Sequence, residues 1–306
     1  MAQTQNLILR IVAQRGEISS GELLEVVQKF GRSSDAFRAA ANRMVRAGLL
    51  TKAGRGRGNL RYGIGPQGQV IIEQFIAKLV RYHVALGGQL AWDGNWLVVA
   101  FSIPEGQRSK RDTFRTRLTE MGFGLLSSSV WISPFDQEAE VTTSIEELGL
   151  AGQVALLHCQ RLWMPGVESV GELVCRVWRL EELEAHYRDF NSRIEALLEL
   201  LERIKRGENA DAEAHFFGAM DLQGELIDIV LTKDPCLPAE LLPTDWPGQR
   251  THELIHALTR AIDRLDLADS RYDYLFHLIQ GMDVLEAFRP EGDDSLRWPP
   301  EGGATR

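Results

Sequence analysis

The 306-residue sequence predicts a multidomain α+β protein, and three observations support this fold class. Stretches with the helical spacing of apolar residues alternate with short runs that are typical of strands. The length allows two or three domains of ordinary size. Charge is divided unevenly, because eleven Lys/Arg against four Asp/Glu give residues 1–67 a net charge of +7, whereas the whole chain carries −9. We therefore expect residues 1–67 to form a separate domain that meets a polyanion.

Three helices are predicted in this basic segment, over about residues 7–12, 23–30 and 33–47. The third has one continuous apolar stripe at helical spacing, formed by Phe37, Ala40, Ala41, Met44 and Val45. Gly48 can end this helix. The short turn that contains Gly31 is the one expected between the two helices of a helix-turn-helix.

The opposite face of the third helix carries the side chains that a helix in the major groove of DNA would offer. Arginine can pair with guanine, asparagine can pair with adenine, and alanine permits close approach. A merely solvated basic face is the alternative. The DNA contacts predicted on this helix are Ser34, Arg38, Ala39, Asn42, Arg43 and Arg46.

A basic hairpin is predicted after the third helix. Alternating apolar residues predict a strand over 60–64, and residues 49–52 predict its antiparallel partner. Three helices followed by a basic hairpin form a winged helix. The glycines in AGRGRGN could instead suggest a phosphate-binding loop, but such a loop needs a helix after it. The DNA contacts predicted on the hairpin are Lys52, Arg55, Arg57 and Arg61.

The middle of the chain predicts a four-stranded domain at residues 88–167, after a connector helix at 68–87. The apolar run from Trp96 to Phe101 predicts a buried strand. Helices at about 107–121 and 138–148, separated by two short strands and followed by a closing strand, complete the order βαββαβ. This order is that of a ferredoxin-like half-barrel.

The remainder predicts a mainly α-helical C-terminal domain at residues 168–289, followed by a frayed tail at 290–306. Within this domain we expect helices at about 180–204, 250–266 and 270–288.

Three cysteines, Cys159, Cys175 and Cys236, form neither a paired framework nor a CxxC motif, so we expect reduced thiols in a cytoplasmic protein. No apolar run approaches the roughly 20 residues that span a bilayer. The first residues lack the apolar core of a signal peptide.

The order of these segments and two motifs resemble the PaaX family, transcriptional repressors of phenylacetic acid catabolism. The motifs are WDGNWLVVAFSIPEGQRSKRDTFRTRL with GFGLLSSSVWISP in the middle, and DPCLPAELLPTDWPG nearer the C-terminus. The resemblance covers nearly the whole chain. It implies a homodimer on near-palindromic double-stranded DNA, released by an aryl-acyl-CoA such as phenylacetyl-CoA, with no cofactor and no catalysis. We expect the dimer to form through regions after residue 68, with helix 180–204 and the C-terminal helices as the contact surfaces.

A metal-dependent hydrolase is the alternative from another functional class. His252-Glu253-x-x-His256 has the spacing of zinc peptidases, in which two histidines one turn apart bind the metal. The sequence lacks the usual HxxGxxH continuation. We therefore expect an ordinary amphipathic helix that buries Leu254, Ile255 and Leu258.

The middle domain also resembles the small ferredoxin-like nucleases of CRISPR adaptation, which carry a metal-binding Asp at the end of the first strand. Here Ser102 follows that strand and the first carboxylate is Glu105, so a Mg²⁺ site is not expected. The next helix carries Arg108, Lys110 and Arg111. These residues are our candidates for binding the effector's phosphate groups; contact with flanking DNA and a merely solvated basic face are the alternatives.

Overall fold

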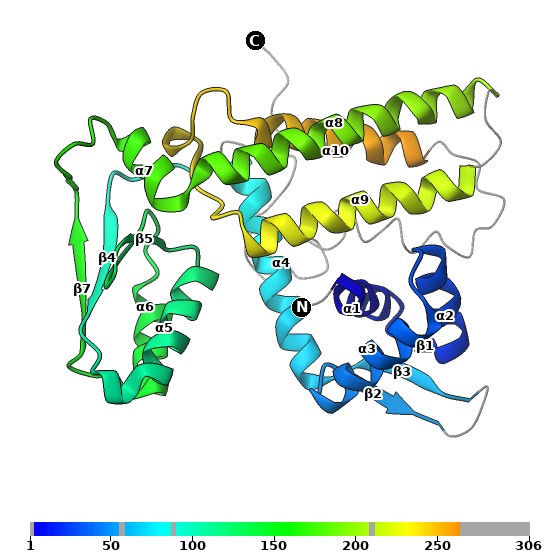
Figure 1. The fold of residues 1–306 in the computed structure, drawn as a ribbon, viewed down its shortest axis with the longest axis horizontal. Coiled ribbons are helices and arrows are strands. Elements are labelled where there is room, and N and C mark those ends of the chain that lie inside the picture. The colour runs from blue at the N-terminus through cyan, green and yellow to red at the C-terminus, as the bar shows by residue number, and fades with distance from the viewer. Residues whose placement is uncertain (1–2, 55–58, 87–89, 208–211, 264–306) are drawn as a thin grey trace, which may run out of the picture. The chain divides into compact units, whose positions relative to one another are not determined.

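The computed structural model describes residues 3–54, 59–86, 90–207 and 212–263, which divide into two compact units (Figure 1). Within the described residues, unit 1 joins the chain up to residue 80 with residues 192–227 and 254–263. Unit 2 joins residues 81–191 with residues 228–253. Each unit therefore combines segments that are distant in the sequence. No helix in the described part of the chain has the length and hydropathy needed to cross a bilayer.

Unit 1 begins with three helices and a small antiparallel sheet. Its elements are α1 (Gln3–Arg15), β1 (Glu17–Ser19), α2 (Ser20–Lys29), α3 (Ser34–Arg46), β2 (Leu50–Ala53) and β3 (Arg61–Ile64). The strand order is β1-β3-β2. The predicted helices and hairpin strands are confirmed, whereas β1 was missed because three residues are too few to show alternation. The ring of Phe37 packs edge-on against Tyr62 at 6.3 Å, which joins α3 to the sheet.

The next helix, α4 (Pro66–Leu86), is closely packed at its start. A Cβ on Gly68 would lie 2.1 Å from the carbonyl oxygen of Leu49, and one on Gly65 would lie 2.2 Å from that of Gly48. Only glycine permits these approaches, because a side chain would overlap the backbone between α3 and β2. The helix begins two residues before the predicted connector, which was expected at residues 68–87.

Unit 2 contains the predicted βαββαβ order. Its elements are β4 (Trp96–Phe101), the 3₁₀ turn η1 (Glu105–Gln107), α5 (Arg108–Glu120), β5 (Gly124–Ser127), β6 (Val130–Ser133), α6 (Glu138–Leu148) and β7 (Val154–Cys159). The strands are antiparallel in the order β5-β6-β4-β7. Helices α5 and α6 cover one face of the sheet (Figure 1). Val99, Phe114 and Val141 are fully buried between them.

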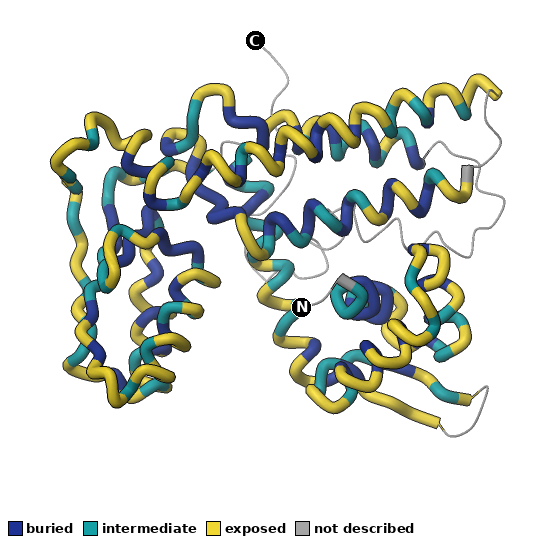
Figure 2. The backbone as a smooth tube through the Cα atoms, in the orientation of Figure 1, coloured by how far each residue is buried: buried dark blue, intermediate teal, exposed yellow. Residues whose placement is uncertain are grey.

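The remaining described elements are helical, as predicted: α7 (Val170–Trp178), α8 (Leu180–Lys205), α9 (Ala212–Thr232), the 3₁₀ turn η2 (Ala239–Leu241) and α10 (Pro247–Asp263). Figure 2 shows buried residues recurring along α8 and α9. Helices α7 and α9 were not predicted from the sequence. The apolar residues of α9 are buried on more than one side, so they form no single stripe. The predicted helix 270–288 and tail 290–306 lie outside the described residues.

The motif DPCLPAELLPTDWPG is built into the interior of unit 2. The hydroxyl of Tyr187 donates a hydrogen bond to Asp234, and the backbone N–H of Cys236 donates to the same carboxylate at 2.6 Å. Asn191 donates to the carbonyl of Pro247 at 3.1 Å. The motif therefore satisfies buried polar groups and connects α8 with the start of α10.

Candidate nucleic-acid interface

Helix α3 is fixed from one side and leaves the predicted contact face open. Ser33 caps its start, because its hydroxyl accepts a hydrogen bond from the N–H of Ala36 at 3.2 Å. Its buried residues are Phe37, Ala40, Ala41 and Met44, four of the five in the predicted apolar stripe; the fifth, Val45, is only partly buried. The exposed residues on the other side are Arg38, Ala39, Asn42, Arg43 and Arg46. The structure therefore brings these five predicted contacts together on one helical face.

The guanidinium groups on this face differ in their surroundings. Arg38 lies 3.3 Å from the carboxylate of Asp35, one turn earlier on the same helix. Among the residues that the structure describes, Arg43 and Arg46 form no ion pair. Their charges are therefore the ones most available to an external anion. Ser34 is partly buried and its hydroxyl accepts from the side chain of Gln28 at 3.2 Å.

The predicted DNA contacts on the hairpin differ in whether an acidic side chain already pairs with them. Lys52 on β2 is exposed. Arg61 on β3 lies 3.0 Å from the carboxylate of Glu17 on β1, so part of its charge is already neutralised within the sheet. Arg55 and Arg57 lie outside the described residues. The sequence could not reveal the pairing of Arg61, because β1 was not predicted.

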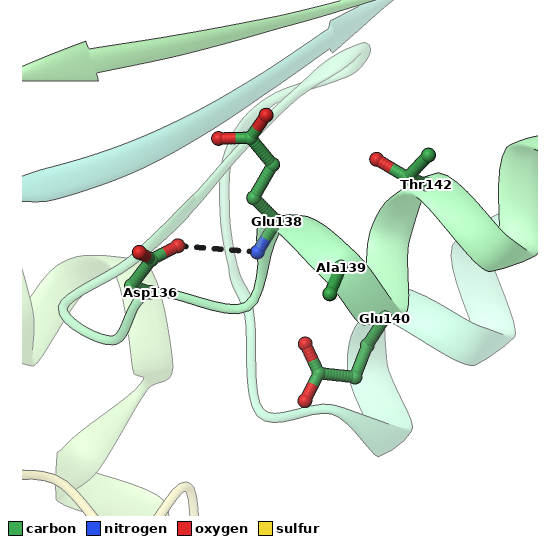
Figure 3. A pocket seen from close by; sticks show the side chains of 5 residues that line it. All are labelled: Asp136, Glu138, Ala139, Glu140 and Thr142. Carbon is green, nitrogen blue, oxygen red and sulfur yellow. Dashed lines mark hydrogen bonds between the residues drawn. The ribbon is translucent and has the colours of Figure 1, made fainter.

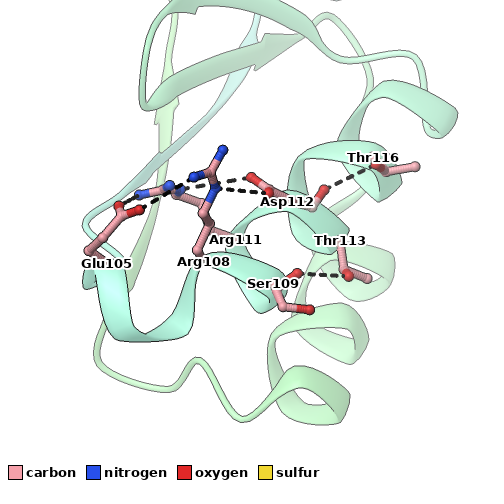
Figure 4. Close-up of polar contacts among 7 residues, drawn as sticks. All are labelled: Glu105, Arg108, Ser109, Arg111, Asp112, Thr113 and Thr116. Carbon is pink, nitrogen blue, oxygen red and sulfur yellow. Dashed lines mark hydrogen bonds and ion pairs between the residues drawn. The ribbon is translucent and has the colours of Figure 1, made fainter.

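The proposed effector phosphates would meet an arginine cluster that already has acidic neighbours (Figure 4). Arg111 lies 2.9 Å from Glu105, and Arg108 lies 3.9 Å from Glu105 and 3.6 Å from Asp112. Lys110 is exposed on the same helix. The two arginines and two acids balance in charge, so this cluster resembles a solvated surface network more than a phosphate site. The assignment stays a prediction.

The histidines of the HExxH motif occupy ordinary helix positions. The ring nitrogens of His252 and His83 lie 3.2 Å apart, while Glu253 lies 3.2 Å from Arg250. Burial, followed by the charge of Arg260, lowers the pKa of His256. In the described residues no third metal-binding side chain joins these histidines. Leu254 and Leu258 are buried as expected, whereas Ile255 is only partly buried.

One group of potential metal ligands lies at the start of α6. Oxygen and nitrogen atoms of Asp136, Glu138 and His158 lie within 4.8 Å of one another, beside an open pocket (Figure 3). His158 is 2.9 Å from Glu138, and Asp136 accepts a hydrogen bond from the N–H of Glu138 at 3.2 Å. All three side chains are exposed and already satisfied by these contacts, so we assign no ion to them.

Comparison with known proteins places these features in a family. Residues 8–67 match the description PaaX-like protein, residues 89–171 match PaaX protein central Cas2-like domain, and residues 178–268 match PaaX-like protein C-terminal domain. The chain is 32% identical over 243 residues to the transcriptional repressor PaaX of Escherichia coli strain K12. This alignment covers 78% of this chain and 72% of that relative.

A solved structure, the uncharacterized protein Rv0674 from Mycobacterium tuberculosis, is also similar. It shares 24% identity and a TM-score of 0.46, over 85% of this chain and 97% of that one. The family models and the described elements define a multidomain α+β protein with a Cas2-like central domain and an exposed cationic helix in its N-terminal segment. The chain belongs to the PaaX family of transcriptional repressors.

Proposed function

We propose that the chain represses transcription by placing α3 in the major groove of double-stranded operator DNA, with the β2–β3 hairpin beside it as the wing of a winged helix. The single observation that carries this proposal is the exposed face of α3, where Arg43 and Arg46 form no ion pair among the described residues. A cationic face with an amide at its centre suits both phosphate contact and base recognition.

The base-recognising residue in this proposal is Asn42, at the centre of that face. An asparagine side chain can make two hydrogen bonds with adenine, so Asn42→Ala should relax selection at one base pair, by about 1–3 kcal/mol. The test is selection of binding sites from a random duplex library by the full chain and by this variant. Identical preferences at every position would show that Asn42 does not contact a base.

We further propose that the protein acts as a homodimer. One recognition helix contacts only a few base pairs. Two such helices, spaced by one turn of the DNA, supply the specificity that a repressor needs. The apolar stripe of α8 is already buried, which argues against our first choice, helix 180–204. Five large hydrophobic side chains are exposed among the described residues, and three of them, Leu157, Trp163 and Val170, fall within one short segment.

This observation moves the proposed dimer contact to the segment 157–170. Light scattering should give a dimer at micromolar concentration, and the double variant Leu157→Asp/Trp163→Asp should give a monomer that stays folded. A dimer in both proteins would exclude this segment as the contact.

The effector and the absence of catalysis also belong to this proposal. An aryl-acyl-CoA such as phenylacetyl-CoA would release the DNA, as the family resemblance implies. We propose that the chain acts by binding alone, and that His252 and His256 belong to helix packing. Zinc retained by the purified protein and lost in His256→Ala would instead favour the hydrolase.

A further inference from the structure

In unit 1, ion pairs join α9 to the residues that precede α3. Figure 1 shows these elements as ribbons. The ammonium group of Lys29, the last residue of α2, lies 2.5 Å from the carboxylate of Glu213. The guanidinium of Arg32, in the turn between α2 and α3, lies 3.6 Å from the carboxylate of Asp221. Two acids of α9 therefore neutralise the last two cations that precede the proposed recognition helix in the sequence.

Apolar contacts support the same arrangement. The rings of Phe30 and Phe217 pack edge-on at 5.2 Å, and both side chains are buried. Farther along α9, a Cβ on Gly224 would lie 2.3 Å from the guanidinium of Arg10 on α1. The guanidinium of Arg10 on α1 therefore lies against the backbone of α9 at Gly224.

The four contacting residues of α9 lie on one helical face. Glu213, Phe217, Asp221 and Gly224 are separated by four, four and three residues, which is the spacing of neighbours along one side of a helix. Glu225 lies next to this face and pairs instead with Arg193 of α8, through two bonds of 2.6 and 2.7 Å. One face of α9 is thus directed to the helices before α3, while α8 holds α9 in place.

We propose that this face of α9 is an autoinhibitory contact, in which Glu213 and Asp221 compete with DNA phosphates for Lys29 and Arg32. The inference rests on the proposed function, because it requires α3 to bind DNA. Cations beside the DNA-contacting face add phosphate contacts when they are free, and each such contact strengthens binding and its dependence on salt. While the acids of α9 hold Lys29 and Arg32, binding depends on the remaining cations.

A purely structural role for these pairs predicts the opposite effect of removing them. If Glu213 and Asp221 only hold α2 and α3 in position, their loss should leave the helices less well placed and weaken DNA binding. Competition predicts tighter binding with a steeper salt dependence. The sign of the change in affinity therefore separates the two roles.

The test uses the full chain and a fluorescent 30-base-pair duplex of random sequence, titrated between 50 and 200 mM salt. The variant Glu213→Gln/Asp221→Asn keeps the side-chain shapes and removes both charges. Exposed ion pairs contribute up to about 1 kcal/mol each, so we expect binding at 50 mM salt to tighten by about threefold to tenfold. The slope of log K against log salt should steepen by up to about 1.8, which corresponds to two further phosphates.

The matched control is Glu199→Gln/Glu202→Gln, which removes two exposed acids of α8 from unit 1 without touching Lys29, Arg32 or the Arg193–Glu225 pair. It should change the affinity much less. In a Lys29→Gln/Arg32→Gln background, the substitutions at Glu213 and Asp221 should have no further effect. Thermal unfolding of each variant checks that the fold is kept.

The inference is overturned if the α9 variant binds no more tightly than the control, or if its effect persists without Lys29 and Arg32. In those cases wild-type binding still leaves the proposed function standing. Failure of the wild-type chain itself to bind duplex DNA would instead remove the proposed function and this inference together.

Discussion

The hydroxyl of Tyr187 donates a hydrogen bond to the carboxylate of Asp234 inside unit 2, where both side chains are buried. Tyr187→Phe removes this donor from a buried carboxylate. We expect the free energy of unfolding to fall by about 1–3 kcal/mol, measured by urea denaturation. Because Asp234→Asn acts on the same bond, the double variant should lose less than the sum of the two single losses. Strict additivity would contradict the bond's contribution.

The same pair predicts a loss of stability at alkaline pH. Burial, together with the negative charge of Asp234, raises the pKa of Tyr187 well above its ordinary value of 10.0, and burial raises that of Tyr82 in the same way. The folded chain therefore keeps both phenol protons at a pH at which the unfolded chain releases them. The contribution of these two tyrosines to the free energy of unfolding is complete below pH 10 and declines as the pH rises above it. Replacing both tyrosines by Phe should make the free energy of unfolding less dependent on pH above 10. An unchanged dependence would show that these tyrosines do not cause it.

Close packing at the start of α4 gives a third prediction. Gly68→Ala places a methyl group 2.1 Å from the carbonyl oxygen of Leu49, so we expect a loss of about 1–3 kcal/mol in urea denaturation. The control is Gly218→Ala in α9, where nothing lies within 4 Å and the residue is exposed. There, alanine should stabilise the helix by up to about 1 kcal/mol. Equal effects of the two substitutions would contradict the packing described at Gly68.

The effector proposal predicts a specific order among ligands. A ligand that moves binding from 99:1 to 1:99 must favour the DNA-free state by about 5.5 kcal/mol, so both the nucleotide phosphates and the aryl group are expected to contribute. Phenylacetyl-CoA should release a bound operator duplex, whereas phenylacetate and CoA alone should release little. Fluorescence anisotropy measures this directly. Equal release by all three ligands would exclude a thioester effector.

Local patterns predicted the elements that carry clear periodicity. The apolar stripe of α3 follows from the spacing of side chains within one helix, so the sequence suffices for it. The order βαββαβ was predictable for the same reason, because its helices alternate with short apolar strands. Helix α9 was missed because it is buried on several sides and shows no single stripe.

Contacts between distant segments could not be predicted. The pairing of Arg61 with Glu17 needs β1, and the contact of Arg32 with Asp221 joins residues almost 190 positions apart. The net charge of residues 1–67 includes both arginines, although Arg61 pairs with Glu17 and Arg32 with Asp221 in the structure. The structure shows that the carboxylates near a basic side chain, as well as its exposure, decide whether its charge is available.

The most direct test of the central claim is the salt dependence of DNA binding by Arg43→Ala/Arg46→Ala. Both side chains are exposed on α3, and the described residues offer them no ion pair, so their loss should not unfold the chain. We expect weaker binding to every duplex and a slope of log K against log salt that is reduced by about 1.8, the value for two phosphate contacts. Wild-type affinity with an unchanged slope in a folded variant would contradict the assignment of α3 as the DNA-binding helix.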